Sequence, residues 1–320
     1  MRRFDAIVTE NRPVADGYCE LRFAWPPGDD GRHADDSRHA DDGRHADDSR
    51  HADDGRHADD GRRADDSRHA DDPAPGRFFT LRAGGRYDPA LRRPFAFSDW
   101  RPSTGAARSG TARSEAACGD TGGEAACVFQ LRGRGTEYLA ALRPGDGLDV
   151  LGPLGRGFAK PPRGARPMLV AGGIGVGPML YLAATLAADA AAGLCEAPIL
   201  VVGARTAALV PAAMLPAGTA VCTDDGSAGF RGTVADWLAS FDPGLPPAFY
   251  ACGPAPMMAA VAAVAASRRA PYEAAVEQWM ACGVGACAGC AVRLRSGDYV
   301  KACSDGPVLD GSTVDWEAMA

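Results

Sequence analysis

The sequence predicts a multidomain fold in which an antiparallel β-barrel precedes an α/β Rossmann-like domain and a small cysteine-rich C-terminal domain. Three observations support this: short strand-like runs without long helices in the first half, alternating strand and helix patterns from Arg166 onward, and four clustered cysteines near the C-terminus. The 320 residues, 46% of them hydrophobic, suffice for two or three domains. We expect these domains to cover residues 1–160, 161–270 and 271–320.

The first domain is predicted from six apolar runs of strand length that are separated by turns. Such a series is typical of a small antiparallel barrel. The runs cover residues 4–10, 18–24, 77–82, 95–98, 127–132 and 148–151.

Two polar segments interrupt this domain, and we expect both to be disordered insertions. Residues 29–72 are seven tandem copies of Asp-Asp-Gly/Ser-Arg-His/Arg-Ala closed by two further Asp, with no apolar residue larger than Ala. Such a tract cannot bury enough surface to offset the entropy lost on ordering. Its six histidines could bind metal weakly, although flexible polar tracts rarely fix ligand geometry. Residues 101–124, rich in Gly, Ala, Ser, Thr and Arg, are typical of a second loop insertion.

The net charge of -7 comes from the repeat tract. Without its 16 Asp and 8 Arg the chain has 26 basic and 25 acidic residues, a balance that gives no electrostatic reason to expect nucleic acid. All six histidines lie in this tract, so the folded domains contain no imidazole base. The N-terminus lacks an apolar signal region, and no stretch approaches the roughly 18 apolar residues of a membrane span. We therefore expect a cytoplasmic protein that makes no contact with a membrane.

The second domain is predicted from strand-length apolar runs that alternate with Ala-rich helical segments, which is typical of a parallel doubly wound sheet. The strands are expected at 168–170, 199–202, 220–222 and 248–251, and the helices at 178–192 and 256–268. The tail after Pro271 is short and rich in Cys and Gly, so we expect something other than a hydrophobic core to organise it.

Two loops of the second domain are candidates for binding a dinucleotide. Gly172, Gly173 and Gly175 lie in a turn between a strand and a helix, where glycine lets the backbone approach a pyrophosphate at the helix N-terminus. The alternative is a tight turn without a ligand. The second loop, formed by Cys252, Gly253 and Pro254, follows the last strand and should reach the same edge of the sheet.

The tail carries a candidate metal site with the spacing C-x4-C-x2-C-x12-C. The first three positions match the loop that binds a 2Fe-2S cluster in plant-type ferredoxins, and the interleaved glycines let the backbone wrap such a cluster. A structural zinc site is the alternative, but zinc loops usually pair two shorter Cys knuckles. The predicted ligands are Cys282, Cys287, Cys290 and Cys303. Five other cysteines are scattered, and we interpret them as small buried or loop residues: Cys19, Cys118, Cys127, Cys195 and Cys222.

Taken together, these motifs resemble the ferredoxin-NADP reductase superfamily and, within it, the electron-transfer subunit of heteromeric dihydroorotate dehydrogenase. The most specific part of the resemblance is the tail, at residues 277–287 and 303–308, and the likeness covers nearly the whole chain apart from the two insertions. It implies an FAD-binding barrel, an NAD-binding Rossmann-like domain and a C-terminal 2Fe-2S domain. Residues 152–158 resemble the exit from the family's barrel, and residues 223–227 a stretch that lines its nicotinamide domain.

The resemblance also implies FAD-binding residues. The family motif Arg-Pro-x-Ser/Thr falls on Arg93, Pro94, Phe95 and Ala96, where Arg93 is expected to pair with the FAD phosphate. Ala96 departs from the motif because it lacks the hydroxyl, although Ser98 lies two residues further on. Gly133, Gly135 and Thr136 match the family's second phosphate loop.

The implied activity is electron transfer from the FMN of a separate dihydroorotate dehydrogenase catalytic subunit, through the 2Fe-2S cluster and FAD, to NAD, in a heterotetramer that serves pyrimidine biosynthesis. One alternative is a flavin and iron-sulfur subunit of a sulfide dehydrogenase or an NADH-ferredoxin transhydrogenase. Those proteins often have Asp as the first cluster ligand, where this chain has Cys282. A non-catalytic redox sensor is a further alternative. Arg205 follows the strand at 199–202 and would suit the 2'-phosphate of NADP, so NAD is expected from the resemblance alone.

Overall fold

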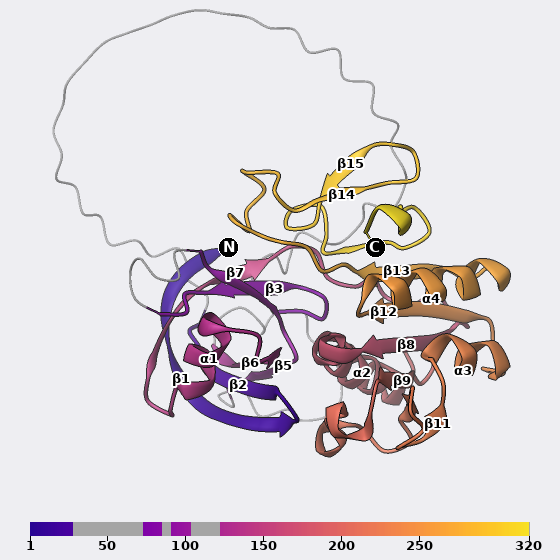
Figure 1. Ribbon diagram of the computed structural model, residues 1–320, viewed down its shortest axis with the longest axis horizontal. Coiled ribbons are helices and arrows are strands. Elements are labelled where there is room, and N and C mark those ends of the chain that lie inside the picture. Colours follow the sequence, from indigo (N-terminus) through magenta and orange to yellow (C-terminus); the bar gives the residue numbers. More distant parts are fainter. Residues whose placement is uncertain (28–72, 85–90, 104–121, 320) are drawn as a thin grey trace, which may run out of the picture.

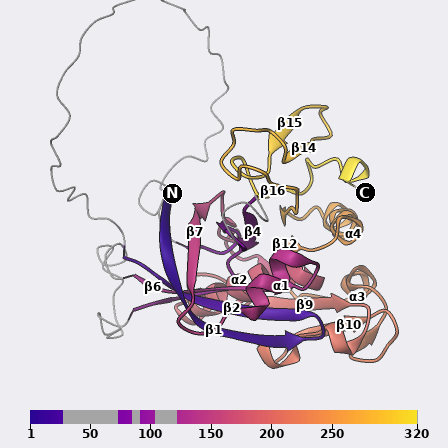
Figure 2. The same cartoon turned by 60° about the vertical axis from the view of Figure 1, so that its left-hand side comes forward.

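The computed structural model describes residues 1–27, 73–84, 91–103 and 122–319. An antiparallel barrel and a parallel sheet lie side by side, and the C-terminal part lies on one side of both (Figures 1 and 2). The repeat at 29–72 lies outside the described residues, as do residues 104–121 of the second expected insertion.

The barrel is built from seven antiparallel strands in the order β4-β3-β7-β1-β2-β6-β5. Edge strand β4 is followed after two residues by β5 at the opposite edge, so one short segment closes the sheet into a barrel, as predicted. The strands are β1 (Arg2–Ala15), β2 (Tyr18–Trp25), β3 (Phe78–Leu81), β4 (Arg93–Ala96), β5 (Asp99–Pro102), β6 (Gly123–Gln130) and β7 (Gly147–Leu154), and helix α1 (Arg134–Ala141) follows β6. The second insertion is shorter than the expected 101–124, because Arg101 and Pro102 of β5 pair with Glu124 and Gly123 of β6.

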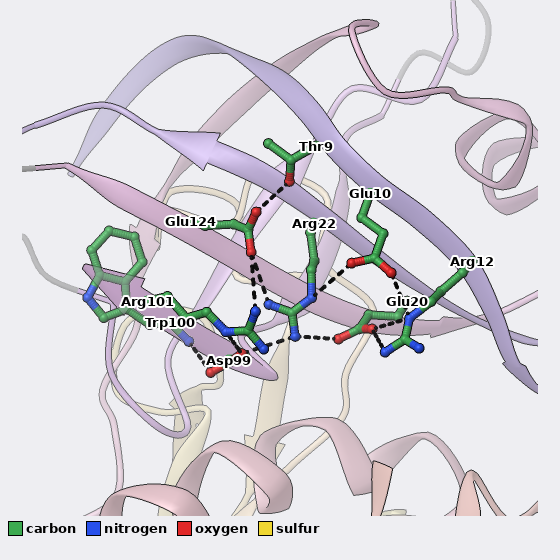
Figure 3. Close-up of polar contacts among 9 residues, drawn as sticks. All are labelled: Thr9, Glu10, Arg12, Glu20, Arg22, Asp99, Trp100, Arg101 and Glu124. Atoms are coloured by element: carbon green, nitrogen blue, oxygen red, sulfur yellow. Dashed lines mark hydrogen bonds and ion pairs between the residues drawn. The ribbon is translucent and has the colours of Figure 1, made fainter. Parts of the chain in front are cut away.

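A charge network lies on the outer face of the barrel, beside the segment that follows β4 (Figure 3). Arg22 is 6% exposed and donates to Glu20 at 2.7 Å, to Asp99 at 3.0 Å and to Glu124 at 3.2 Å. Burial opposes the charge of Arg22, but these carboxylates outweigh it and raise the pKa of the guanidinium. Through Asp99, the network fixes the chain directly after the predicted FAD motif.

The second domain is a doubly wound sheet in the order β11-β10-β9-β8-β12-β13-β16, parallel except for β16. The chain enters at central β8, moves outward through β9 and β10, and then returns to β12 on the other side of β8. Loops at such a switch point form the usual ligand crevice of an open parallel sheet. The strands are β8 (Arg166–Gly172), β9 (Ile199–Ala204), β10 (Ala220–Thr223), β11 (Phe230–Arg231), β12 (Pro247–Cys252), β13 (Tyr272–Ala275) and β16 (Val308–Asp310), and the helices are α2 (Val176–Ala191), α3 (Val234–Ser240) and α4 (Ala255–Ser267).

Helix α2 lies between the two sheets, because it contacts β8, β9 and β12 on one side and β5 and β6 of the barrel on the other. With its preceding turn, Gly173–Ala191, it is the one helix among the described residues that is long and apolar enough to cross a membrane. The expectation that no stretch approaches this length was therefore wrong. Half of the helix is buried inside the protein, and a core helix needs the same composition, so this finding is weak evidence for a membrane span.

The cysteine-rich tail contributes β13 and β16 to the parallel sheet and forms a small hairpin of β14 (Ala291–Arg293) and β15 (Tyr299–Lys301). The expectation that something other than a hydrophobic core organises the tail was wrong. Cys290, Val292 and Cys303 are at most 2% exposed and share one hydrophobic cluster with Met168 and Phe249 of the sheet. The apolar residues of the tail are few and scattered in sequence, and only the neighbouring sheet makes them contiguous.

Candidate functional site

The structure brings the two predicted FAD-binding motifs together. Gly135 lies at the start of α1, and a Cβ built on it would be 3.2 Å from Nε of Arg93 on strand β4. Arg93 also donates from Nη1 to the carbonyl of Leu91 at 2.6 Å, which orients its guanidinium. A guanidinium placed over a helix N-terminus fits a phosphate, because both are positive and both donate hydrogen bonds.

Thr136 shapes this loop from within. Its hydroxyl accepts the N–H groups of Arg132 at 2.9 Å and Gly133 at 3.2 Å, and it donates to the carbonyl of Gly133 at 2.9 Å. These contacts turn the chain tightly into α1. The hydroxyl therefore acts by positioning the loop that would carry the phosphate.

The remaining motif residues hold β4 on the barrel. The ring of Phe95 packs 5.9 Å from that of Phe129, and Pro94 pairs with Thr80 of β3. Ser98 does not replace the hydroxyl that Ala96 lacks. Its Oγ is buried and has no hydrogen-bond partner among the described residues, and its Cβ would touch a Cβ on Gly177 of α2 at 3.5 Å, so it is enclosed between the barrel and α2.

The first prediction concerns FAD retention. Replacing Arg93 with Ala removes the guanidinium beside the α1 N-terminus, and a charge-assisted hydrogen bond contributes roughly 1.5–3 kcal/mol. We expect FAD to dissociate about one to two orders of magnitude more readily. Flavin content after dialysis measures this, and Arg163→Ala, at the far end of the parallel sheet, is the control. Unchanged flavin content in Arg93→Ala would remove this residue from the site.

The two candidate dinucleotide loops touch each other at the switch point. A Cβ on Gly175 would lie 2.0 Å from the carbonyl oxygen of Cys252, and one on Gly172 would lie 2.9 Å from Cδ of Pro254. Gly253 in turn would meet Gly172 at 3.0 Å. These glycines are therefore needed for the close packing of the two loops, a reason that differs from the close approach of a pyrophosphate expected from the sequence. Gly173 differs from them, because it has a φ of +53° and faces the hydroxyl of Tyr18 on the barrel.

A substitution tests this loop packing. Gly175→Ala places a methyl group on the Cys252 carbonyl, so the second loop must move, and such overpacking typically costs about 1–3 kcal/mol of unfolding free energy. We expect this loss in chemical denaturation, together with weaker NADH binding. Gly147→Ala is a matched control, because a Cβ there meets nothing within 4 Å. Equal stability of the two variants would contradict the packing.

The stretch at 223–227 forms a turn closed by its own side chains at the same edge of the sheet. The hydroxyl of Thr223 donates to the Ala228 carbonyl at 2.8 Å, and Asp225 accepts from Ser227 N–H at 2.9 Å and from Ser227 Oγ at 2.6 Å. These hydrogen bonds from Ser227 lower the pKa of Asp225. These internal hydrogen bonds fix the conformation of the turn at the carboxyl end of β10.

The four predicted metal ligands lie together in two pairs. Cys282 is within hydrogen-bonding reach of Cys287, and Cys303 of Cys290. Each sulfur also accepts a backbone N–H: Cys282 from Val284 at 3.5 Å, Cys287 from Gly289 at 3.5 Å, Cys290 from Cys303 at 3.4 Å and Cys303 from Gly285 at 3.1 Å. The N–H of Val284 and its neighbours lower the pKa of Cys282 to about 6, whereas burial raises the pKa of Cys303 to about 11.

This paired arrangement distinguishes the two metal alternatives. Zinc needs four ligands around a single point, whereas a 2Fe-2S cluster takes two cysteines on each of two irons. The two cysteine pairs, with an N–H donor on each sulfur, fit the two irons of a 2Fe-2S cluster.

The cluster loop packs directly on the barrel. Gly283 has a φ of +72°, and a Cβ on it would lie 3.3 Å from Cγ2 of Thr80 on β3. On the other side of the cluster loop, Arg156 N–H donates to the carbonyl of Gly306 at 2.6 Å. Because β3 pairs with β4, one strand separates the cluster loop from the strand that carries Arg93.

Lys301 is a residue near the cluster that sequence reasoning missed, although its position two residues before Cys303 was a usable signal. Its Nζ donates to the carbonyl of Gly285 at 2.9 Å, and so joins the two segments that carry the ligands. We expect Lys301→Met to lower the reduction potential of the cluster by about 30–60 mV, because a cation favours the more negative reduced state. For a one-electron centre, about 59 mV corresponds to a tenfold change in the equilibrium constant of reduction. A spectroscopic redox titration measures this, and Lys301→Arg should restore the potential. An unchanged potential in Lys301→Met would contradict the assignment.

Known proteins share this architecture. Residues 277–315 match the family model of the iron-sulfur cluster binding domain of dihydroorotate dehydrogenase B. Among solved structures, the NADH-dependent reduced ferredoxin-NADP oxidoreductase aligns with a TM-score of 0.63 at 22% identity over 98% of this chain and 91% of its own. Phthalate dioxygenase reductase aligns with a TM-score of 0.52 at 14% identity over 94% and 77%. Both likenesses show the fold alone.

Sequence relatives are more specific. The "Dihydroorotate dehydrogenase B (NAD(+)), electron transfer subunit" of Desulforamulus reducens is 34% identical over 252 residues, which cover 76% of this chain and 87% of the relative. The protein with the same name from Geobacillus thermodenitrificans is 35% identical over 249 residues, 75% of this chain and 86% of the relative. With this identity across nearly the full length of its relatives, the chain belongs to the family of electron transfer subunits of NAD-linked dihydroorotate dehydrogenase B.

Proposed function

We propose that this chain carries electrons from a dihydroorotate dehydrogenase catalytic subunit, through a 2Fe-2S cluster and FAD, to NAD in pyrimidine biosynthesis. The observation that carries the proposal is the placement of the cluster loop against β3, one strand away from the FAD motif. Such contact keeps two redox centres close enough for direct electron transfer.

The cofactors supply the redox chemistry, since hydride exchange between nicotinamide and flavin requires no protein base. The chain's own residues bind the cofactors and orient them. Arg93 and the α1 N-terminus would hold the FAD phosphates, the loops of Gly173 and Cys252 would hold the dinucleotide, and the cluster would be held by Cys282, Cys287, Cys290 and Cys303. The histidines of the sequence all lie in the repeat tract, which suits a subunit that leaves proton abstraction from dihydroorotate to its partner.

The partner in this proposal is an FMN-containing catalytic subunit, assembled with this chain as a heterotetramer in the cytoplasm. Two features of the cluster domain support a partner there. Cys287 is exposed, so the cluster would have an open edge, and Trp279, three residues before Cys282, is 90% exposed. Large exposed aromatic side chains are typical anchors of protein interfaces.

The alternative, that this chain is a subunit of another NAD(P)H oxidoreductase, has less support. The likeness to the ferredoxin-NADP oxidoreductase is 22% identity and concerns the fold, whereas the curated relatives at 34–35% identity are dihydroorotate dehydrogenase subunits. Cys282 as the first ligand agrees with this assignment.

Co-expression with the FMN barrel subunit tests the proposal. We expect a complex whose visible spectrum shows flavin and 2Fe-2S bands, and which reduces NAD with dihydroorotate. A chain that binds both cofactors but copurifies with a different flavoprotein, and supports no dihydroorotate oxidation, would overturn it.

A further inference from the structure

Thr80 is the barrel residue on which the cluster loop rests. Its neighbours Phe79 and Leu81 belong to the barrel core, so Thr80 points out of the barrel from the opposite face of β3. It is nevertheless only 3% exposed, and its methyl carbon Cγ2 lies 3.3 Å from the position that a Cβ on Gly283 would take. The orientation of this side chain therefore affects how the cluster loop sits on β3.

Arg92 fixes the orientation of Thr80. Its Nε donates to Oγ1 of Thr80 at 2.9 Å, and its Nη2 donates to the Thr80 carbonyl at 3.0 Å. Hydrogen bonds from a charged donor are stronger than those between neutral groups, so they favour one rotamer of Thr80. Because Arg92 holds the hydroxyl, the methyl group is the part of the side chain that faces Gly283.

The guanidinium of Arg92 is in turn held by strand β7. Its Nη2 also donates to the Asp149 carbonyl at 2.6 Å, and its Nη1 pairs with the carboxylate of Asp149 at 2.9 Å. Both side chains are 16% exposed. Burial opposes the charge of Asp149, but the hydrogen bonds from Arg3 and Arg92 outweigh it and lower the pKa of this carboxyl. Arg92 therefore connects β3 with β7 beneath the cluster loop.

Arg92 directly precedes Arg93, the residue predicted to bind the FAD phosphate. Consecutive side chains of an extended segment point to opposite sides. Arg93 lies beside Gly135 of α1, whereas Arg92 reaches Thr80 and Asp149. One pair of adjacent residues thus links the contact surface of the cluster loop with the predicted phosphate site.

We propose that Arg92 is a positioning residue for electron transfer between the cluster and FAD, because it holds the cluster loop in place on the barrel through Thr80. The inference rests on the proposed function and deepens it, since it names residues that set the separation of the two cofactors and bind neither. Loss of Arg92 should loosen the loop and leave both FAD binding and FAD reduction by NADH intact.

Two measurements on the full chain, loaded with FAD and cluster, test the proposal. Hydrogen exchange reports how firmly the loop is held, and we expect Arg92→Gln to speed exchange in residues 282–289 about tenfold or more. After anaerobic mixing with NADH, which gives two electrons to FAD, the flavin absorbance should fall as in the wild type. Transfer of one of these electrons to the cluster should then be about tenfold slower, because a misplacement of about 1 Å can change a rate by one to two orders of magnitude.

Thr80 offers a matched pair of variants. Thr80→Ser removes the methyl group that faces Gly283 and keeps the acceptor for Arg92, whereas Thr80→Val keeps a methyl group and removes the acceptor. Both should loosen the cluster loop in the same two measurements. Arg3→Gln is the control and should behave like the wild type, because Arg3 also pairs with Asp149 but its side chain is 67% exposed.

The outcomes separate this inference from the proposed function. Wild-type exchange and a wild-type cluster phase in Arg92→Gln would overturn the inference, and so would loss of FAD from this variant on dialysis, which would assign Arg92 to the flavin site. If Arg92→Gln does not fold, Thr80→Ser decides the question, because it leaves the pair of Arg92 and Asp149 in place. A wild-type chain whose cluster NADH does not reduce would contradict the proposed function itself.

Discussion

Replacing Cys290 with Ser is expected to abolish dihydroorotate-driven NAD reduction in the reconstituted complex while NADH still reduces an artificial dye. Cys290 is 1% exposed and pairs with Cys303, so its loss should remove one cysteine from an iron and disable the cluster. The FAD and dinucleotide loops belong to other parts of the chain and remain in place. Hydride exchange between NADH and FAD does not pass through the cluster, so only the route to the partner is cut.

The quantity to measure is the ratio of the two activities, because a folding defect would lower both together. Iron and sulfide analysis with the visible spectrum confirms cluster loss. Cys195→Ser changes a free, half-buried cysteine outside the predicted ligand set and should leave both activities unchanged. Equal loss of both activities in Cys290→Ser, or a surviving dihydroorotate reaction in a variant shown to lack the cluster, would exclude the proposed electron route.

The second large effect is expected on stability, from Arg22→Ala in the barrel network (Figure 3). Removing the buried guanidinium breaks its ion pairs with Glu20, which is 1% exposed, and with Asp99 and Glu124, and it leaves Glu20 only the half-exposed Arg12 as a cation. Breaking a buried ion pair on one side typically costs about 3–5 kcal/mol. We expect a loss of this size in chemical denaturation, and reduced FAD retention because Asp99 follows the FAD motif.

A neighbouring arginine provides the matched control. Arg101 contacts Asp99 at 3.0 Å but its side chain is 63% exposed, so Arg101→Ala should cost less than about 1 kcal/mol. Equal stability losses in the two variants would contradict the role of Arg22.

The sequence predicted those parts of the candidate site whose geometry is set within one short segment. The spacing of Cys282, Cys287 and Cys290 predicts a loop that wraps a cluster, and the structure gives each sulfur an N–H donor. Arg93 and Gly135 were assigned separately to one phosphate site, and the fold places them in contact. Local patterns of glycine and cysteine constrain the backbone of one short segment directly. The geometry that they predict therefore does not depend on residues distant in sequence.

Features that depend on neighbours distant in sequence were misjudged or missed. The tail seemed to lack a core, because its apolar residues become contiguous only against Met168 and Phe249. The packing role of Gly172 and Gly175 was missed, because the second loop that lies against them is distant in sequence. Tyr18 gave no sequence signal, since its hydroxyl meets Gly173 only where the barrel meets the turn before α2.

By itself the sequence determined the class of each domain, and it predicted the cluster ligands and the order of the cofactor motifs along the chain. These depend on hydrophobic periodicity and short-range spacing, which are local properties of the chain. The tertiary structure alone decided that the cluster loop packs on the barrel one strand from Arg93, and that the turn of Gly173 meets Tyr18 of the barrel. Such contacts arise from the packing of surfaces far apart in sequence, where no local pattern records which residues will meet.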